Sequence, residues 1–178
     1  MAALSGDLRR GRTPALSHLA AIAACAVTLA ACASTSSYQT AAMEASDAGD
    51  QKKAISLATK EVERFSTPDQ CSRSTNYNCG TLALAYGTLA GYQILDGDRA
   101  AGERSFRSAK QALGQTAADN RSSATAMVYR DVSEAFWKTG DRTRAVSVFR
   151  EGRAAGGDFY LFMSSAAKAA DHPPEAAP

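Results

Sequence analysis

Residues 129–152 read YRDVSEAFWKTGDRTRAVSVFREG and contain the pattern from which the fold can be inferred. Two amphipathic stretches flank Gly140 and Asp141. Glycine adopts the left-handed conformation that ends a helix at little cost, and aspartate caps the N-terminus of the next one. Small side chains in mid-helix let two helices approach closely. This stretch therefore predicts two antiparallel helices joined by a tight turn.

The same pattern occurs three times along the chain. Gly-Asp pairs stand at 49–50, 97–98 and 140–141, and a tyrosine precedes each glycine by eleven residues. Repetition in register favours an array of helical hairpins over an ordinary alanine-rich bundle, which is the alternative. The fold class predicted is all-α, without strands. Helices are expected near 36–47, 51–65, 81–95, 99–113, 123–138, 142–154 and 158–169.

The third unit resembles the tetratricopeptide repeat (TPR), with signature positions at Tyr129, Val132, Ser133, Phe136, Gly140, Ala145 and Phe149. The second unit matches less fully, and the first has alanine where the second helix should carry phenylalanine. Extra residues fall at 66–80 and around 114–123. The resemblance implies a TPR-like stack of three antiparallel hairpins over 36–170, closed by a C-terminal capping helix.

The C-terminal end is expected to close the array. Gly156 and Gly157 interrupt the chain, and Asp158 is placed to cap a last helix over 158–169. The apolar start of that helix is expected to cover the end of the third unit. Residues 171–178, which are rich in proline, are predicted to be a disordered tail.

The N-terminal stretch Leu29-Ala30-Ala31-Cys32 ends an apolar run over 15–31 that follows three arginines. It resembles the lipobox of bacterial lipoproteins. The resemblance implies that residues 1–31 are a cleaved signal peptide, that Cys32 carries the lipid and that 32–35 form a tether. Ala33 after the cysteine then indicates the periplasmic face of the outer membrane. An uncleaved signal anchor, an ordinary signal peptide, and inner-membrane or surface-exposed anchoring are the alternatives.

Cys71 and Cys79 remain once Cys25 and Cys32 are assigned to the signal peptide and the lipid. Disulfides persist outside the cytoplasm, so we expect these two cysteines to be bonded. A metal site is the rival interpretation, but two thiols without a nearby histidine fall short of a structural zinc site. The enclosed loop is expected to act as a staple, with a rigid recognition loop as the alternative. We predict no metal and no cofactor.

Charge and histidine content argue against two broad functions. Without residues 1–31 the chain has 17 basic and 17 acidic residues, whereas nucleic-acid binding needs a basic surplus. The one remaining histidine, His172, lies in the predicted tail, so no histidine-based nucleophile pair is expected. We therefore expect neither a nucleic-acid partner nor catalytic residues, and the protein is not expected to be an enzyme.

The TPR resemblance implies a groove, lined by the first helix of each hairpin, that accepts a peptide or a partner helix. Carried onto this sequence, the groove residues are Thr88, Gly91, Arg130, Glu134, Trp137 and Lys138, accompanied by Leu84, Gly87, Leu95 and Met127. Arg130 and Trp137 are the expected anchor pair, unless Trp137 packs under the capping helix. The predicted function is an envelope adaptor. A structural lipoprotein that self-associates is the alternative.

Overall fold

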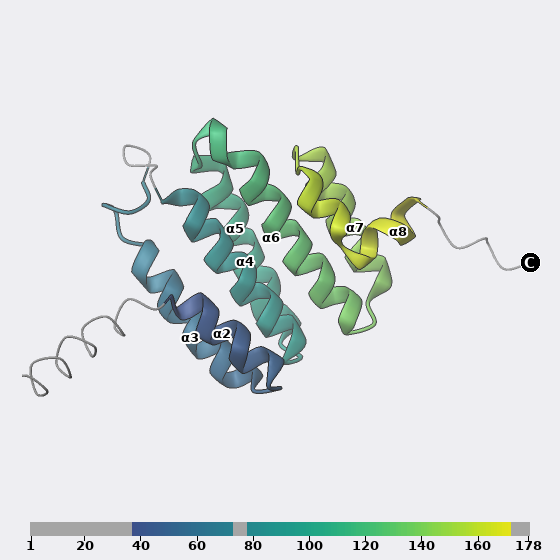
Figure 1. The fold of residues 1–178 in the computed structure, drawn as a ribbon, viewed down its shortest axis with the longest axis horizontal. Helices are drawn as coiled ribbons and strands as arrows, with labels where there is room; N and C mark the ends of the chain where they lie inside the picture. The colour runs from purple at the N-terminus through teal and green to yellow at the C-terminus, as the bar shows by residue number, and fades with distance from the viewer. Residues whose placement is uncertain (1–36, 73–77, 172–178) are drawn as a thin grey trace, which may run out of the picture. The chain divides into compact units, whose positions relative to one another are not determined.

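The computed structural model describes residues 37–72 and 78–171, and within these ranges every regular element is helical. The elements are α2 (Tyr38–Asp47), α3 (Gln51–Phe65), α4 (Cys79–Leu95), α5 (Arg99–Gln115), α6 (Ala118–Lys138), α7 (Arg142–Ala154), the 3₁₀ helix η2 (Phe159–Met163) and α8 (Ser165–Asp171) (Figure 1). The all-α prediction is confirmed for the described residues. None of these helices is both long enough and apolar enough to span a bilayer.

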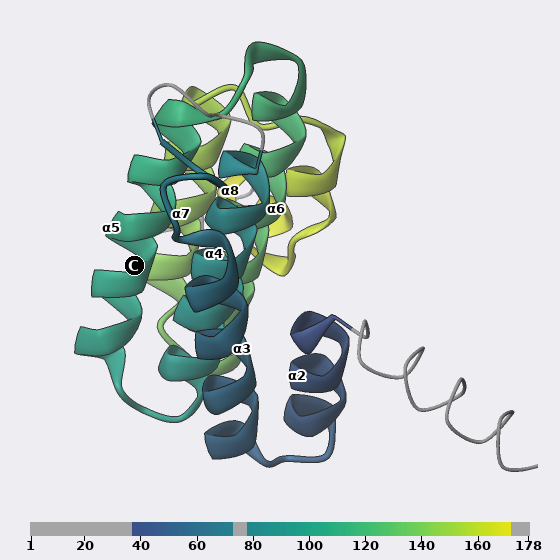
Figure 2. The ribbon, with the colours of Figure 1, turned by 90° about the vertical axis from the view of Figure 1, so that its left-hand side faces the viewer.

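The long helices form three sequential pairs. α2 packs on α3, α4 on α5, and α6 on α7, and each pair is antiparallel across a short turn (Figures 1 and 2). Contacts between α3 and α4 and between α4 and α6 join one pair to the next. The first helices of the three pairs, α2, α4 and α6, therefore run in the same direction.

The three Gly-Asp turns have the geometry expected from the sequence. Gly49, Gly97 and Gly140 have φ values of 83°, 90° and 88°, in the left-handed region that favours glycine. The aspartate after each glycine caps the next helix, accepting from the backbone N–H of Lys53 (3.0 Å), Ala101 (2.8 Å) and Arg144 (3.0 Å) respectively. One local signal thus sets all three turns.

The core is built from small side chains with a few aromatic rings between the helices. Phe106, Phe136 and Phe149 are almost completely buried, and many of the other core positions are alanine. A Cβ added at Gly87 would lie 3.2 Å from the Cα atom of Val128, so α4 and α6 approach backbone to backbone there. Close packing of this kind leaves little room for larger residues.

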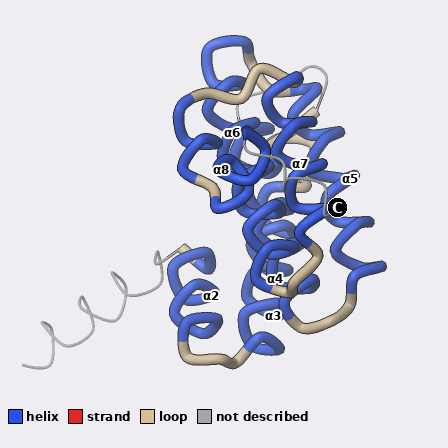
Figure 3. The backbone as a smooth tube through the Cα atoms, turned by 90° about the vertical axis from the view of Figure 1, so that its right-hand side faces the viewer, coloured by secondary structure: helices blue, strands red, loops and turns tan. Residues whose placement is uncertain are grey.

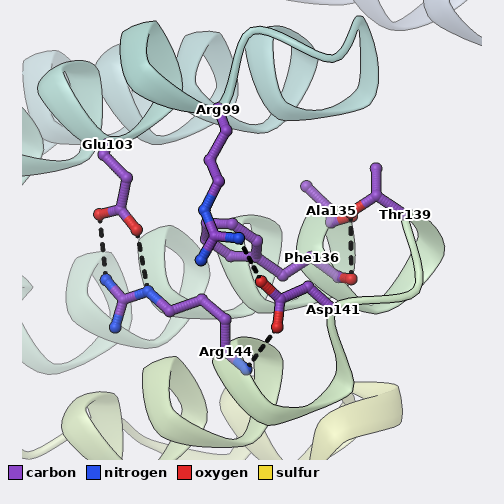
Figure 4. Close-up of polar contacts among 7 residues, drawn as sticks. All are labelled: Arg99, Glu103, Ala135, Phe136, Thr139, Asp141 and Arg144. Atoms are coloured by element: carbon purple, nitrogen blue, oxygen red, sulfur yellow. Dashed lines mark hydrogen bonds and ion pairs between the residues drawn. The ribbon is translucent and has the colours of Figure 1, made fainter.

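Ion pairs join α5 to α7 at the third turn (Figure 4). Arg144 binds Glu103 through two hydrogen bonds of 2.9 and 3.0 Å, and Arg99 lies 2.6 Å from the Asp141 carboxylate. The hydrogen bond to Glu103 raises the pKa of the Arg144 guanidinium. Both guanidinium groups lie over the Phe136 ring, at 5.3 and 5.6 Å from its centre. Asp141 therefore caps α7 and also ties it to the preceding pair.

The two cysteines outside the N-terminal region lie side by side. Their sulfur atoms are 2.07 Å apart, which is compatible with the expected disulfide. Cys79 is fully buried and is the first residue of α4, so the bond holds the start of that helix to the loop after α3. Residues 73–77 of the enclosed loop lie outside the described residues, and the recognition-loop alternative stays a prediction.

Reduction of this disulfide is expected to destabilise the domain. A ring of nine residues corresponds to about 2.5 kcal/mol of chain entropy, or a melting temperature lower by about 5–10 °C. Calorimetry with and without a reductant measures the shift, and a Cys71→Ser/Cys79→Ser variant is the control. The melting temperature of this variant should not respond to the reductant. If the melting temperature of the parent did not respond either, the bond would contribute no stability.

The C-terminal segment differs from the single helix expected over 158–169. η2 covers Phe159–Met163, Ser164 takes an extended conformation, and α8 then runs to Asp171, one residue into the predicted tail. The break has a tertiary cause, because the Glu134 carboxylate on α6 accepts from the backbone N–H and the hydroxyl of Ser165. The apolar start was expected to cover the third pair. Leu161 does so, whereas its four apolar neighbours are exposed.

The second insertion is also shorter than expected. α6 begins at Ala118 and not near residue 123, so only Thr116 and Ala117 separate it from α5. Arg121 donates two hydrogen bonds, of 2.7 and 3.2 Å, to the carbonyl of Thr116 and so closes the turn. Most of the extra residues therefore lengthen α6 at its N-terminal end.

Candidate functional site

A hollow of about 450 Å³ lies between the first helices of the three pairs. Figure 3 shows the course of these helices, α2, α4 and α6. We call the hollow the groove. Its lining combines apolar, polar and charged side chains from α2, α4 and α6: Gln39, Met43, Ser46, Asp47, Thr88, Gly91, Tyr92, Leu95, Met127, Arg130, Asp131, Glu134, Ala135 and Lys138. The volume is in the range of ligand-binding clefts.

Five of the six residues predicted to bind a partner line this groove. Thr88 and Gly91 come from α4, and Arg130, Glu134 and Lys138 come from successive turns of α6. Leu95 and Met127, from the wider predicted face, line it as well. The helical spacing places these residues on one side of each helix, so the sequence pattern was sufficient to group them.

Trp137 lies away from the groove, and the expected Arg130–Trp137 pair is not formed there. Its indole borders a second hollow, shared with residues of η2 and α8 such as Met163 and Lys168. The Arg142 guanidinium lies 3.7 Å from the ring centre. Trp137 therefore sits beside the C-terminal segment, close to the alternative in which it packs under the cap.

The sequence did not identify the contribution of α2. Met43 and Asp47 of α2 project into the groove, and Met43 is 53% exposed. The first unit matches the repeat least well, because its second helix lacks phenylalanine. Its first helix nevertheless carries groove residues at positions 39, 43, 46 and 47, the spacing of one helical face. That spacing was the signal that could have found them.

Asp131 and Tyr92 are two further groove residues that the sequence did not single out. Arg130 donates to the Asp131 carboxylate at 2.9 and 3.1 Å, and Thr88 also hydrogen-bonds it. Burial raises the pKa of Asp131 above its ordinary value in spite of Arg130, and the Glu134 carboxylate adds to the increase. The pKa of Tyr92 is raised to about 12, mainly by burial and further by the charges of Asp131 and Asp47. The groove lining thus contains three carboxylates, those of Asp47, Asp131 and Glu134, beside the cations of Arg130 and Lys138.

Replacing Asp131 with asparagine is expected to stabilise the protein at neutral pH. A carboxyl whose pKa is raised on folding binds its proton more tightly in the folded state, so the ionised form weakens folding above the ordinary value of 3.8. The variant should have the higher free energy of unfolding at neutral pH, and the advantage should disappear below that value. Denaturant titration at neutral pH and below pH 3.8 measures the difference in free energy of unfolding between the variant and the parent. A variant less stable at neutral pH would show that the Arg130 pair outweighs burial.

Glu134 has a second role besides lining the groove. Its carboxylate is held at the start of α8, where the Ser165 hydroxyl donates to it at 3.1 Å. A groove ligand would therefore meet Glu134 already hydrogen-bonded, which leaves Asp47 and Lys138 as the exposed charges at that end. The groove and the C-terminal segment share one side chain.

The groove lining offers contacts that are suited to binding a ligand. Apolar side chains from all three helices can receive an apolar group, while Thr88, Gln39 and Ser46 offer hydrogen bonds to a backbone. Within residues 37–72 and 78–171, no three histidine, cysteine or acidic side chains are grouped so as to hold a metal ion. Cys32 lies outside the described residues.

Comparisons with protein-family models, with curated proteins and with solved structures find no match to this chain.

Proposed function

We propose that this protein is a lipid-anchored adaptor facing the periplasm, whose TPR-like groove binds a peptide or a helix of a cell-envelope protein. The observation that carries the proposal is the convergence of α2, α4 and α6 on one hollow, into which five residues expected to bind a partner project. In TPR domains the first helix of each hairpin lines the binding groove. The proposed role is in assembling or localising an envelope complex.

The helix pairs support the TPR-like interpretation. Each pair is joined by a left-handed glycine and an aspartate cap, and successive pairs are in contact. Departures from a regular array also exist, since α3 and α4 are separated by a long loop and α6 has 21 residues. These departures leave the order of the helices intact.

The anchor rests on the stretch Leu29-Ala30-Ala31-Cys32. The described residues begin at Ser37, so four residues, 33–36, would separate the first of them from a lipidated Cys32. Several acyl chains hold a protein at a bilayer far longer than one chain does. Replacing Cys32 with serine should abolish labelling by palmitate and release the protein from the membrane fraction. Retention in that fraction would favour an uncleaved anchor.

The groove is tested by photo-crosslinking from defined positions in the full-length protein in its own membranes. A photoreactive residue at Met43 faces the groove, and one at Lys52, exposed on α3 and outside the groove lining, is the matched control. We expect one envelope protein to be crosslinked from position 43 and not from position 52. Equal products from both positions would contradict a groove partner, and a product of twice the protein's mass would indicate the self-associating structural lipoprotein.

A further inference from the structure

The charged side chains that line the groove do not balance one another. Arg130 is paired with Asp131 at 2.9 Å, so these two opposite charges largely offset each other. Two carboxylates, Asp47 and Glu134, and one cation, Lys138, are left for a ligand to meet. The hydrogen bond from Ser165 leaves Glu134 charged. Within residues 37–72 and 78–171, neither Asp47 nor Glu134 forms an ion pair with a basic side chain.

The ends of the three groove helices meet at one end of the groove. Asp47, Leu95 and Lys138 are the last residues of α2, α4 and α6, and all three line the groove. The C-terminal carbonyl groups of a helix have partial negative charge, which favours a cation nearby. Lys138 supplies a basic side chain to the last turn of α6, whereas the last turns of α2 and α4 contain none. Two of the three helix ends therefore lack a cation of their own.

Tyr92 lies in the groove one turn before the end of α4, where its side chain is half-buried. Besides burial, the charges of Asp131 on α6 and Asp47 on α2 raise the pKa of the Tyr92 hydroxyl. Carboxylates from two different helices thus act on one point of the groove. A tyrosine ring is, in addition, a surface on which a lysine or arginine side chain can lie.

Apolar side chains from all three helices line the same groove. They are Met43 on α2, Leu95 on α4 and Met127 on α6, and Met43 is 53% exposed. Methionine adapts its shape to different apolar partners. Lysine and arginine have long aliphatic stems that pack on apolar surface while the charged group stays at a polar site. A basic side chain next to apolar ones therefore fits this lining better than a purely charged group.

We propose that the groove binds a protein segment that presents a lysine or arginine beside apolar residues. Its basic group would lie at the end formed by Asp47, Tyr92 and Leu95, and its apolar residues would extend toward Met127. This inference rests on the proposed function, because it specifies the partner of the same groove. An acidic segment or an anionic headgroup is a poorer occupant, because it would meet two carboxylates and one unpaired cation.

The test begins with a library of random twelve-residue peptides, displayed on phage and selected against the full-length protein held in detergent. Peptides that bind the parent and not Met43→Ser/Leu95→Ser are taken as groove peptides. We expect lysine or arginine next to apolar residues more often in these peptides than in the starting library. Raising the salt concentration should weaken their binding, because salt screens the attraction between opposite charges.

Fluorescence anisotropy with a selected peptide then measures the sign of the charge effect. Asp47→Asn should weaken binding about two- to fivefold, and Lys138→Gln should strengthen it by a similar factor, because the competing cation is removed. The matched controls are Glu63→Gln and Lys52→Gln. They make the same charge changes at exposed positions of α3 outside the groove lining, so binding should be unchanged.

Groove peptides that are rich in aspartate or glutamate, or that have no excess of basic residues, would overturn the inference. Weaker binding to Lys138→Gln together with tighter binding to Asp47→Asn would do the same and would indicate an anionic ligand. Recovery of no groove peptide would also count against it. The proposed function fails separately, through equal crosslinking from positions 43 and 52. Crosslinking from position 43 alone, with peptides of the wrong charge, would leave the groove a partner of another chemistry.

Discussion

Replacing Gly152 with alanine is expected to lower the free energy of unfolding by about 2–3 kcal/mol. A Cβ at this position would lie 2.6 Å from the Cβ and 2.7 Å from the Cγ of Tyr129, and 3.0 Å from a methyl of Leu161. Tyr129 cannot easily move, because its ring packs edge-on against Phe106 at 5.1 Å and its hydroxyl donates to Glu151 at 3.3 Å. α6 and α7 would have to separate.

The matched control is Gly114→Ala in α5. Gly114 is also helical, but a Cβ there would meet no atom within 4 Å, so the added methyl should stabilise the helix by up to about 0.5–1 kcal/mol. Urea denaturation of both variants separates packing from helix propensity. Losses of equal size in the two variants would contradict the close approach of α6 and α7 at Gly152.

The hairpins could be predicted because their signals are local. Gly140 ends α6 and Asp141 caps α7 through atoms a few residues apart, so sequence alone sets this turn. The start of α6 could not be placed in the same way, because Ala117 at its N-cap makes no side-chain hydrogen bond. There Arg121 closes the turn through the Thr116 carbonyl, and no capping residue marks the boundary.

The C-terminal segment was mispredicted because its geometry depends on distant residues. Phe159–Met163 is apolar throughout, and the sequence suggested continuous helix. The contact between Glu134 and Ser165 joins residues 31 apart in sequence and begins a separate helix. The same contact is the part of the role of Glu134 that the sequence did not predict. Its helical position places it at the groove, and only tertiary structure shows that its carboxylate is shared with α8.

The sequence likewise predicted one part of the candidate groove and not the other. Helical spacing was enough to bring Thr88, Gly91, Arg130 and Lys138 together, since it fixes which face of α4 and α6 they occupy. Trp137 follows Arg130 by seven residues and was expected on that face too. It lies at the edge of that face, and Arg142, the first residue of α7, covers its ring. The surroundings of a residue at the edge of a helix face depend on which side chains the next helix places beside it.

Removing two apolar side chains from the groove is expected to weaken partner binding by about tenfold or more. Met43→Ser and Leu95→Ser act on α2 and α4, which contribute different walls of the groove. Apolar anchors in the centre of an interface contribute over about 1 kcal/mol each to the free energy of binding, and serine replaces each of them with a small polar side chain. The envelope protein crosslinked from position 43 is captured with the parent and with the double variant, and the two amounts are compared across concentrations.

The control for this variant is Leu57→Ser on α3. Leu57 is half-buried like Leu95 and packs against the same core, but it does not line the groove. Both variants should lose similar stability, so melting temperatures show whether unfolding accounts for any loss of binding. Leu57→Ser should bind the partner as the parent does. If it lost as much binding as the double variant, the groove would not be the partner's site, and if neither lost binding, the partner would contact another face of the domain.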